Sequence, residues 1–161
     1  MDLIINIDGG SRGNPGPGAS AWIIKDKTGK KLAAEGVFFA LCTNNQAVFN
    51  ALKMALLKAF ALGGKRLEVR SDSLLLVKQY AGEYKIKNPE LKVLMREIKA
   101  LAAKFAVVRL SHVPRAQNKE ADLMCNITMD NNLKKPADAA APKPRPKKEP
   151  AQGELFDLSN L

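Results

Sequence analysis

Three strand-like segments open the chain, and the connections between them are too short to hold a helix. Residues 3–8, 19–25 and 31–39 are rich in apolar side chains. Parallel neighbours need a crossover of roughly a dozen residues or more, so these segments are expected to pair antiparallel. Residues 9–18 are rich in glycine and predict a loop, and residues 26–29 predict a hairpin turn.

Helical and strand patterns alternate in the next part of the chain. Residues 45–62 repeat apolar side chains at three- and four-residue steps, with Thr43 as the expected N-cap and Gly63 as the stop. The later elements are expected to be a strand over 67–70, a helix over 71–80 capped by Ser71 or Asp72, a helix from Asn88 to about residue 104, a strand over 106–111 and a helix over 119–130. This order predicts an α/β fold with a mixed five-stranded sheet, three antiparallel strands then two parallel, and helices on both faces.

The composition changes after the last predicted helix. Proline, alanine and lysine dominate residues 133–151, so this segment is expected to be a disordered linker. Residues 1–132 are expected to form one domain. Apolar side chains return in residues 152–161, which we consider separately below.

The charge of the chain indicates the class of its partner. The formal net charge is +10, which favours a polyanion, with nucleic acid as the first candidate and an anionic membrane as the second. No apolar run approaches the roughly 20 residues of a membrane-spanning helix, and the start of the chain lacks a signal-sequence pattern. A cytoplasmic location without membrane association is therefore expected. Cys42 and Cys125 are expected to be buried thiols and not a disulfide or a zinc site.

Four motifs occur in a fixed order along the chain. They are INIDGGSRGNPG at residues 5–16, TNNQAV at 43–48, VRSDS at 69–73 and HVPRAQNKEAD at 112–122. Together they closely resemble type 1 ribonuclease H, and the likeness runs from Asp8 to about Asn132. The chain resembles the compact subgroup of bacterial and archaeal type, which lacks an additional basic helix. The resemblance implies a ribonuclease H-like fold and endonucleolytic cleavage of the RNA strand of RNA–DNA hybrids. A monomer is expected, because nothing in the sequence suggests an oligomer.

The aspartates of these motifs suit metal-dependent hydrolysis. Phosphodiester cleavage is served by two Mg²⁺ ions about 4 Å apart, held by oxygen ligands. The resemblance implies that Asp8, Asp72 and Asp122 are the Mg²⁺ ligands, with Mn²⁺ as a substitute. Taken singly, each aspartate is more often a helix cap or a loop residue. His112 precedes Asp122 by ten residues and matches the family's proton-transfer histidine, with a structural role as the alternative.

One carboxylate of the family is missing. The family's catalytic glutamate, which binds a metal ion and contacts the ribose 2′-hydroxyl, falls at Val48, whose side chain does neither. Asn44 and Asn45 offer only neutral oxygens nearby. We therefore expect cleavage slower by at least about two orders of magnitude. The alternative interpretation is a non-catalytic RNA–DNA hybrid-binding module.

Polar side chains in the motifs are the expected contacts to the substrate. By resemblance, the residues that contact the hybrid are Arg12, Asn14, Asn44, Asn45 and Gln117. Such contacts recognise helix form and ribose and not base sequence. A second group is expected either to follow the phosphates of the DNA strand or to be a solvated helix face: Lys85, Lys87, Lys92, Arg96 and Lys99.

The end of the chain carries a further short motif. Residues 152–156 resemble the Gln-x-x-Leu-Phe peptides with which bacterial replication and repair proteins bind the sliding clamp, with Gln152, Leu155 and Phe156 as the anchors. The alternative is a frayed terminus. Clamp binding would raise the local concentration of the domain at sites of DNA replication.

Overall fold

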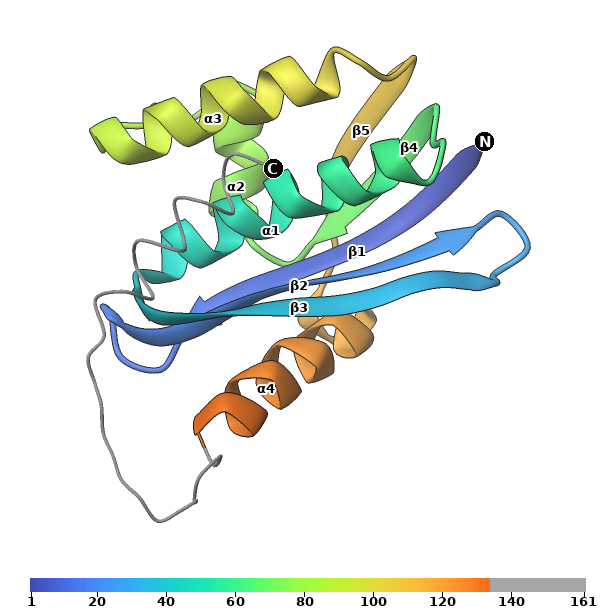
Figure 1. Ribbon diagram of the computed structural model, residues 1–161. Helices are drawn as coiled ribbons and strands as arrows, with labels where there is room; N and C mark the ends of the chain where they lie inside the picture. The colour runs from blue at the N-terminus through green and yellow to red at the C-terminus, as the bar shows by residue number, and fades with distance from the viewer. Residues whose placement is uncertain (134–161) are drawn as a thin grey trace.

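A five-stranded mixed sheet is the centre of the computed structural model, which describes residues 1–133 (Figure 1). Its strands are β1 (Asp2–Ser11), β2 (Gly16–Asp26), β3 (Lys31–Cys42), β4 (Arg66–Ser71) and β5 (Val107–His112), in the spatial order β3-β2-β1-β4-β5. The first three strands pair antiparallel, whereas β4 runs parallel to β1 and β5 parallel to β4. The predicted fold class and strand directions are confirmed.

Helices cover both faces of this sheet. They are α1 (Asn44–Ala61), α2 (Leu74–Tyr80), α3 (Pro89–Ala102) and α4 (Lys119–Leu133), and a short 3₁₀ turn at Arg115–Gln117 precedes α4. Figure 1 shows α1 and α3 on one side of the sheet and α4 on the other. The main core fills the first side, where buried side chains of β1 such as Ile5 and Ile7 meet Leu52 and Leu56 of α1.

A smaller core lies beneath α4. Ala19 and Ala21 of β2 pack there against Cys125 and Met129 of α4. Cys125 and Cys42 are both free and buried, as the sequence predicted. Burial raises the pKa of the Cys42 thiol to about 11 and is the largest cause that raises the pKa of Cys125 to about 12. Both thiols are therefore protonated packing groups near neutral pH.

Local capping residues explain where the helices begin. Thr43 and Gln46 form a reciprocal capping box at the start of α1, and Gly63 follows its end with a φ of 85°. For α2 the expected cap was wrong. Ser71 is buried in β4, so Ser73 is the N-cap and its hydroxyl accepts a hydrogen bond from the backbone of Leu76 at 3.2 Å.

The glycine-rich segment forms a hairpin instead of the predicted long loop. Strand β1 continues to Ser11 and β2 begins at Gly16, because the antiparallel pairing of the two strands extends to Ser11 and Gly18. Gly9 also allows β1 to lie directly against the backbone of α1. A Cβ atom at Gly9 would lie 2.7 Å from the backbone nitrogen of Val48 and closer still to the carbonyl of Ala47. Ser20 also donates its hydroxyl to that carbonyl at 2.6 Å. The contact fixes the first turns of α1 beside β1.

Two predictions fall at or beyond the end of the described residues. Leu133, the first residue of the expected linker, is the last residue of α4. The rest of that linker lies outside the described residues, and so does the peptide with Gln152, Leu155 and Phe156. Within residues 1–133, no helix is both long and apolar enough to cross a membrane.

Candidate functional site

The parallel pairing of β1 with β4 brings two of the predicted aspartates to the same end of the sheet. Ile7 pairs with Ser71, so Asp8 and Asp72 are the next residues along the two neighbouring strands. Side chains alternate between faces along a strand, and Ile7 is buried on the α1 side. Asp8 therefore points toward the α4 side of the sheet.

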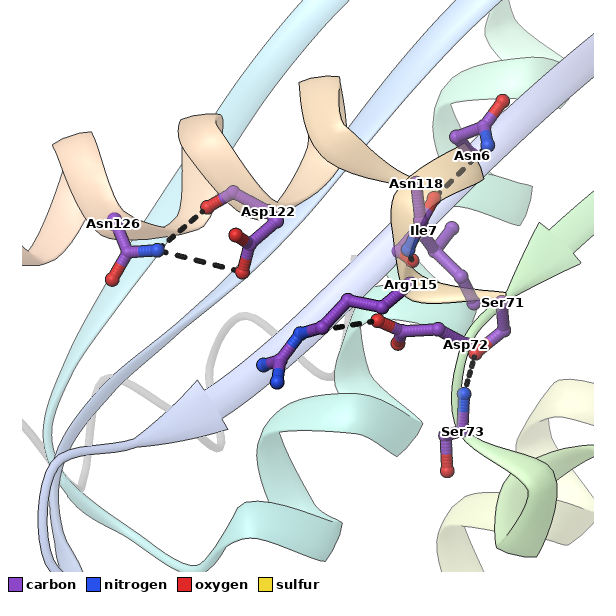
Figure 2. Close-up of polar contacts among 9 residues, drawn as sticks. All are labelled: Asn6, Ile7, Ser71, Asp72, Ser73, Arg115, Asn118, Asp122 and Asn126. Atoms are coloured by element: carbon purple, nitrogen blue, oxygen red, sulfur yellow. Dashed lines mark hydrogen bonds and ion pairs between the residues drawn. The ribbon is translucent and has the colours of Figure 1, made fainter. Parts of the chain in front are cut away.

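Helix α4 supplies the third aspartate, and a buried asparagine fixes its start. Asn118 donates its side-chain amide to the carbonyl of Ile7 at 2.8 Å, and its carbonyl oxygen accepts a bond from Asn6 at 2.9 Å (Figure 2). Asp122 lies one turn later, and its backbone N–H donates to Asn118 at 3.1 Å. Asn118 was not among the predicted site residues, although its place in the fourth motif was a signal.

The electrostatics of Asp8 indicate that the three carboxylates are neighbours. The pKa of Asp8 is raised from 3.8 to about 7, first by burial, then by the charges of Asp72 and Asp122 and by a side-chain hydrogen bond with Asp122. A hydrogen bond from the backbone of Gly9 acts in the opposite direction. We call Asp8, Asp72 and Asp122 the carboxylate cluster. A cation placed among them would relieve the cost of gathering these charges.

The carboxylate oxygens of the cluster are suitable ligands for a divalent cation, but their positions do not yet enclose one. Carboxylate oxygens are the ligands that hard divalent ions prefer. However, no group of three or more His, Cys, Asp or Glu side chains in residues 1–133 is arranged so that it could hold a metal ion. Figure 2 shows Asp72 directed toward Arg115, whose Nε lies 3.9 Å from its carboxylate. The donor set fits, but it is not a closed ligand shell.

Position 48 lies beside this cluster and carries a hydrocarbon. Val48 is half-buried and packs against the main core. Its backbone is close to Gly9, the residue that follows Asp8. The structure thus places Val48 where the first turns of α1 meet the strand that holds Asp8.

The asparagines predicted to contact a hybrid gather at the start of α1. Asn44 accepts hydrogen bonds from the backbone and the hydroxyl of Ser11, at 2.8 and 3.1 Å. Asn14 accepts one from the backbone of Asn44 at 3.0 Å. We call Ser11, Asn14 and Asn44 the asparagine network. Asn45 is exposed beside it, whereas Gln117 lies apart, in the 3₁₀ turn before α4.

Arg12, another predicted contact, is directed toward α4. Its guanidinium lies 2.7 Å from the carboxylate of Asp130 and donates to the side-chain oxygen of Asn126 at 3.1 Å. Both partners are far from Arg12 in the sequence. The β1–β2 turn is thereby attached to the helix that carries Asp122.

The structure does not bring His112 to the carboxylate cluster. His112 ends β5 and pairs with Ser71, which itself pairs with Ile7. Paired residues share a face, so this register places His112 on the sheet face opposite to Asp8. Its role in proton transfer stays a prediction without geometric support here.

The basic residues around α3 divide into two kinds. Lys85, Lys87, Lys92 and Arg96 are exposed. Lys99 is engaged, because its ammonium donates to the carbonyl of Tyr80 at 2.7 Å and lies 3.7 Å from the centroid of the Tyr80 ring. Desolvation lowers the pKa of Lys99. The predicted contact of Lys99 with phosphates of the DNA strand stays a prediction, and the contact of Lys99 with Tyr80 disfavours it.

Comparison with protein families gives a match over most of the described residues. A family model described as "Reverse transcriptase-like" matches residues 6–128. The bifunctional protein Rv2228c of Mycobacterium tuberculosis is 40% identical over 133 residues, which are 81% of this chain and 36% of that protein. The chain thus spans little more than a third of this curated relative.

Solved structures of similar proteins have the same fold. RNase H1 from the archaeon Halobacterium salinarum is 36% identical, with a TM-score of 0.79 over 81% of this chain and 99% of that one. LC11-RNase H1 in complex with an RNA/DNA hybrid is 35% identical, with a TM-score of 0.77 over 81% of this chain and 99% of that one. Identities at this level support comparison of individual motifs as well as of the fold.

Proposed function

The chain belongs to the type 1 ribonuclease H family, and we propose that it binds RNA–DNA hybrids and cleaves their RNA strand endonucleolytically, at a reduced rate. The observation that carries this proposal is the approach of Asp8, Asp72 and Asp122 at one end of the sheet. A hybrid is the substrate class because a similar protein, LC11-RNase H1, has been solved with one.

Ribonucleases of this family use divalent metal ions, and we propose Mg²⁺ here, with Mn²⁺ as a substitute. Such ions activate the attacking water and neutralise charge on the leaving oxygen. Asp8, Asp72 and Asp122 would hold them. Arg115 is mostly exposed beside Asp72, so it is free to turn toward a phosphate once that carboxylate has another cationic partner.

The reduced rate follows from Val48. A glutamate there would add a fourth carboxylate on the α1 side of the cluster, whereas Asp8, Asp72 and Asp122 contribute only from the sheet and α4. Water completes the coordination of Mg²⁺ readily, so binding of metal survives better than catalysis. We expect a loss of at least about two orders of magnitude in cleavage rate.

Recognition is proposed to rest on polar groups at the start of α1. Asn14 contacts Asn44 at the start of α1, next to Asn45, whereas Gln117 lies in the 3₁₀ turn before α4. The hydrogen bonds of the asparagine network hold two of these side chains in place before a ligand arrives. Specificity is then for the ribose and shape of the hybrid, with little base preference.

The experiment that tests this function measures cleavage and binding together. A hybrid labelled on its RNA strand is incubated with the full chain in Mg²⁺, in Mn²⁺ and in EDTA, with Asp8→Asn as the inactive control. We expect slow internal cleavage that needs metal and is lost in Asp8→Asn. The cleavage proposal is contradicted if both proteins leave the RNA intact.

A non-catalytic hybrid-binding module is the second candidate, favoured by the valine at position 48. It predicts tighter binding of hybrid than of duplex DNA at matched salt, without cleavage under any metal condition. Equal affinity for both duplexes would indicate a general basic DNA-binding protein and exclude both candidates.

Binding to the sliding clamp, action during DNA replication, and a monomeric state are further proposals. The first two rest on the sequence of residues 152–156 and on no described contact, and the third on the lack of any sequence feature that suggests an oligomer. Deletion of residues 152–161 is expected to abolish clamp binding and to leave hybrid affinity unchanged. Unchanged clamp binding by the deletion variant contradicts the docking proposal.

A further inference from the structure

Arg12 makes two contacts with α4 that none of the motif resemblances explains. One guanidinium nitrogen lies 2.7 Å from Oδ1 of Asp130, and the other donates to Oδ1 of Asn126 at 3.1 Å. The side chains of Arg12 and Asp130 are 39% and 42% exposed, so the ion pair by itself adds little stability. The contact with Asn126 deserves a separate explanation, because Asn126 also reaches the carboxylate cluster.

Asn126 connects Arg12 to Asp122. Its side-chain nitrogen donates to the backbone carbonyl of Asp122 at 3.0 Å and to the carboxylate of Asp122 at 3.4 Å (Figure 2). The two residues are one helical turn apart on α4. The amide of Asn126 therefore has its oxygen toward Arg12 and its nitrogen toward Asp122.

The partners of Asn126 at its two ends favour the same orientation of the amide. A guanidinium has donors only, so the group that faces it must be an acceptor, which here is the amide oxygen. The amide nitrogen donates to the two acceptors of Asp122. If Arg12 were absent, the nitrogen could still donate to Asp122, but the oxygen would lose its donor and the side chain would lose one of the contacts that hold it.

We propose that Arg12 is a positioning residue, which acts through Asn126 to hold the carboxylate of Asp122 in place for a divalent cation. We call the contacts from Arg12 through Asn126 to Asp122 the relay. It connects the β1–β2 turn to α4, and the carboxylate of Asp130 neutralises the guanidinium of Arg12. This inference deepens the proposed function and rests on the assignment of Asp122 as a metal ligand. It replaces a direct contact between Arg12 and a phosphate of the hybrid.

Variants of Arg12 separate the two roles when Mn²⁺ binding and hybrid binding are measured independently. Calorimetry with Mn²⁺ alone reports the cation, and fluorescence anisotropy in EDTA reports the hybrid. Arg12→Met keeps the aliphatic stem without donors, Arg12→Lys keeps a charged donor, and Asp130→Asn keeps the contact between Arg12 and Asn126.

Arg12→Met is expected to weaken Mn²⁺ binding about ten-fold, since loss of a group that orients a ligand typically costs 10- to 100-fold. Arg12→Lys and Asp130→Asn should stay within about two-fold of the unchanged protein. Hybrid affinity in EDTA should also change by less than about two-fold. A larger loss of hybrid affinity than of Mn²⁺ affinity, or no change in either, overturns the proposal.

A measurement without metal keeps the inference separate from the proposed function. If the unchanged protein binds no Mn²⁺, the proposed function fails, but the relay is still visible in the NMR resonances of the Asn126 side-chain amide. Arg12→Met should shift these resonances, while Asp130→Asn should leave them near their original positions. Asn126 resonances that do not respond to Arg12→Met overturn the relay.

Discussion

The carboxylate cluster and the asparagine network lie on neighbouring parts of the same sheet end, but they differ in completeness. In the network, Asn44 accepts two hydrogen bonds from Ser11, and Asn14 accepts one from Asn44. In the cluster, the half-buried Asp8 lies among like charges, and a valine stands where the family has a carboxylate. The groups proposed for recognition are held by hydrogen bonds, whereas one of the carboxylates expected for cleavage is replaced by valine.

We therefore propose that binding and cleavage of a hybrid are separable properties of the fold. Gly9 of β1 touches the backbone of α1 between the two regions. Changes at that contact should damage both regions, and changes within one region should affect one property. The following substitutions test this expectation.

Gly9→Ala should have the largest effect on stability. Its Cβ would lie 2.7 Å from the backbone nitrogen of Val48, so α1 has to move away from β1. We expect a loss of about 3 kcal/mol in the free energy of unfolding, measured by urea denaturation. Gly10→Ala is the matched control, because its Cβ would meet only the side chain of Asn44, at 3.7 Å. Equal losses for the two variants would contradict the proposed tight contact.

Asp8→Asn should stabilise the protein in the absence of metal. The folded-state pKa of about 7 lies above the ordinary value of 3.8, so the folded protein holds a proton that the unfolded chain releases between these values. The contribution of Asp8 to stability is therefore most favourable below about pH 4 and is lost as the pH rises toward 7. Removing the charge should raise the free energy of unfolding at pH 7 by about 1 to 3 kcal/mol and flatten this slope.

Thermal unfolding in EDTA between pH 4 and 8 measures this effect. Asp2→Asn serves as the control, because Asp2 lies at the opposite end of β1 from the cluster. Addition of Mg²⁺ should stabilise the unchanged protein more than Asp8→Asn. A destabilising Asp8→Asn substitution at pH 7 would show that the three charges are not crowded.

Asn44→Ala should affect recognition alone, and by a smaller amount. It removes the acceptor for the backbone and hydroxyl of Ser11, so the β1–β2 turn loses its attachment to α1. Hybrid affinity should fall about ten-fold, equivalent to about 1.4 kcal/mol, with the cleavage rate at saturation within about two-fold. Asn132→Ala, at the far end of α4, is the control for losing an exposed asparagine. A fall in rate without a fall in affinity would place Asn44 in the chemistry.

Local signals in the sequence predicted the elements whose ends are set by neighbouring residues. Thr43, the expected N-cap, directly precedes α1, so the predicted start of the helix at residue 45 was right to within a residue. The approach of Asp8 and Asp72 also followed from the sequence, because Asp8 ends the first predicted strand and Asp72 lies just past the fourth. Prediction failed where residues far apart in the sequence determine the ends of a helix or strand.

The failures have identifiable physical causes. The extension of β1 to Ser11 depends on its pairing with β2 through the glycine-rich segment, which no local pattern reveals. The N-cap of α2 is Ser73 and not the expected Ser71 or Asp72. Ser71 is buried through pairing of β4 with β1 and β5, which the local sequence does not reveal. The contacts of Arg12 with α4, more than a hundred residues along the chain, have no local signal either. The roles predicted for Arg12 and His112 stay predictions, although strand register places His112 on the sheet face opposite to Asp8.

The most direct test of separable binding and cleavage is a single-turnover titration of labelled hybrid with the unchanged protein, Val48→Glu and Val48→Gln in Mg²⁺. Each titration yields a maximal cleavage rate and a half-saturating concentration. We predict that Val48→Glu raises the rate at least about 100-fold, that neutral Val48→Gln does not, and that half-saturation shifts by less than about three-fold. Rapid cleavage by the unchanged protein with no gain in Val48→Glu would contradict the role assigned to Val48.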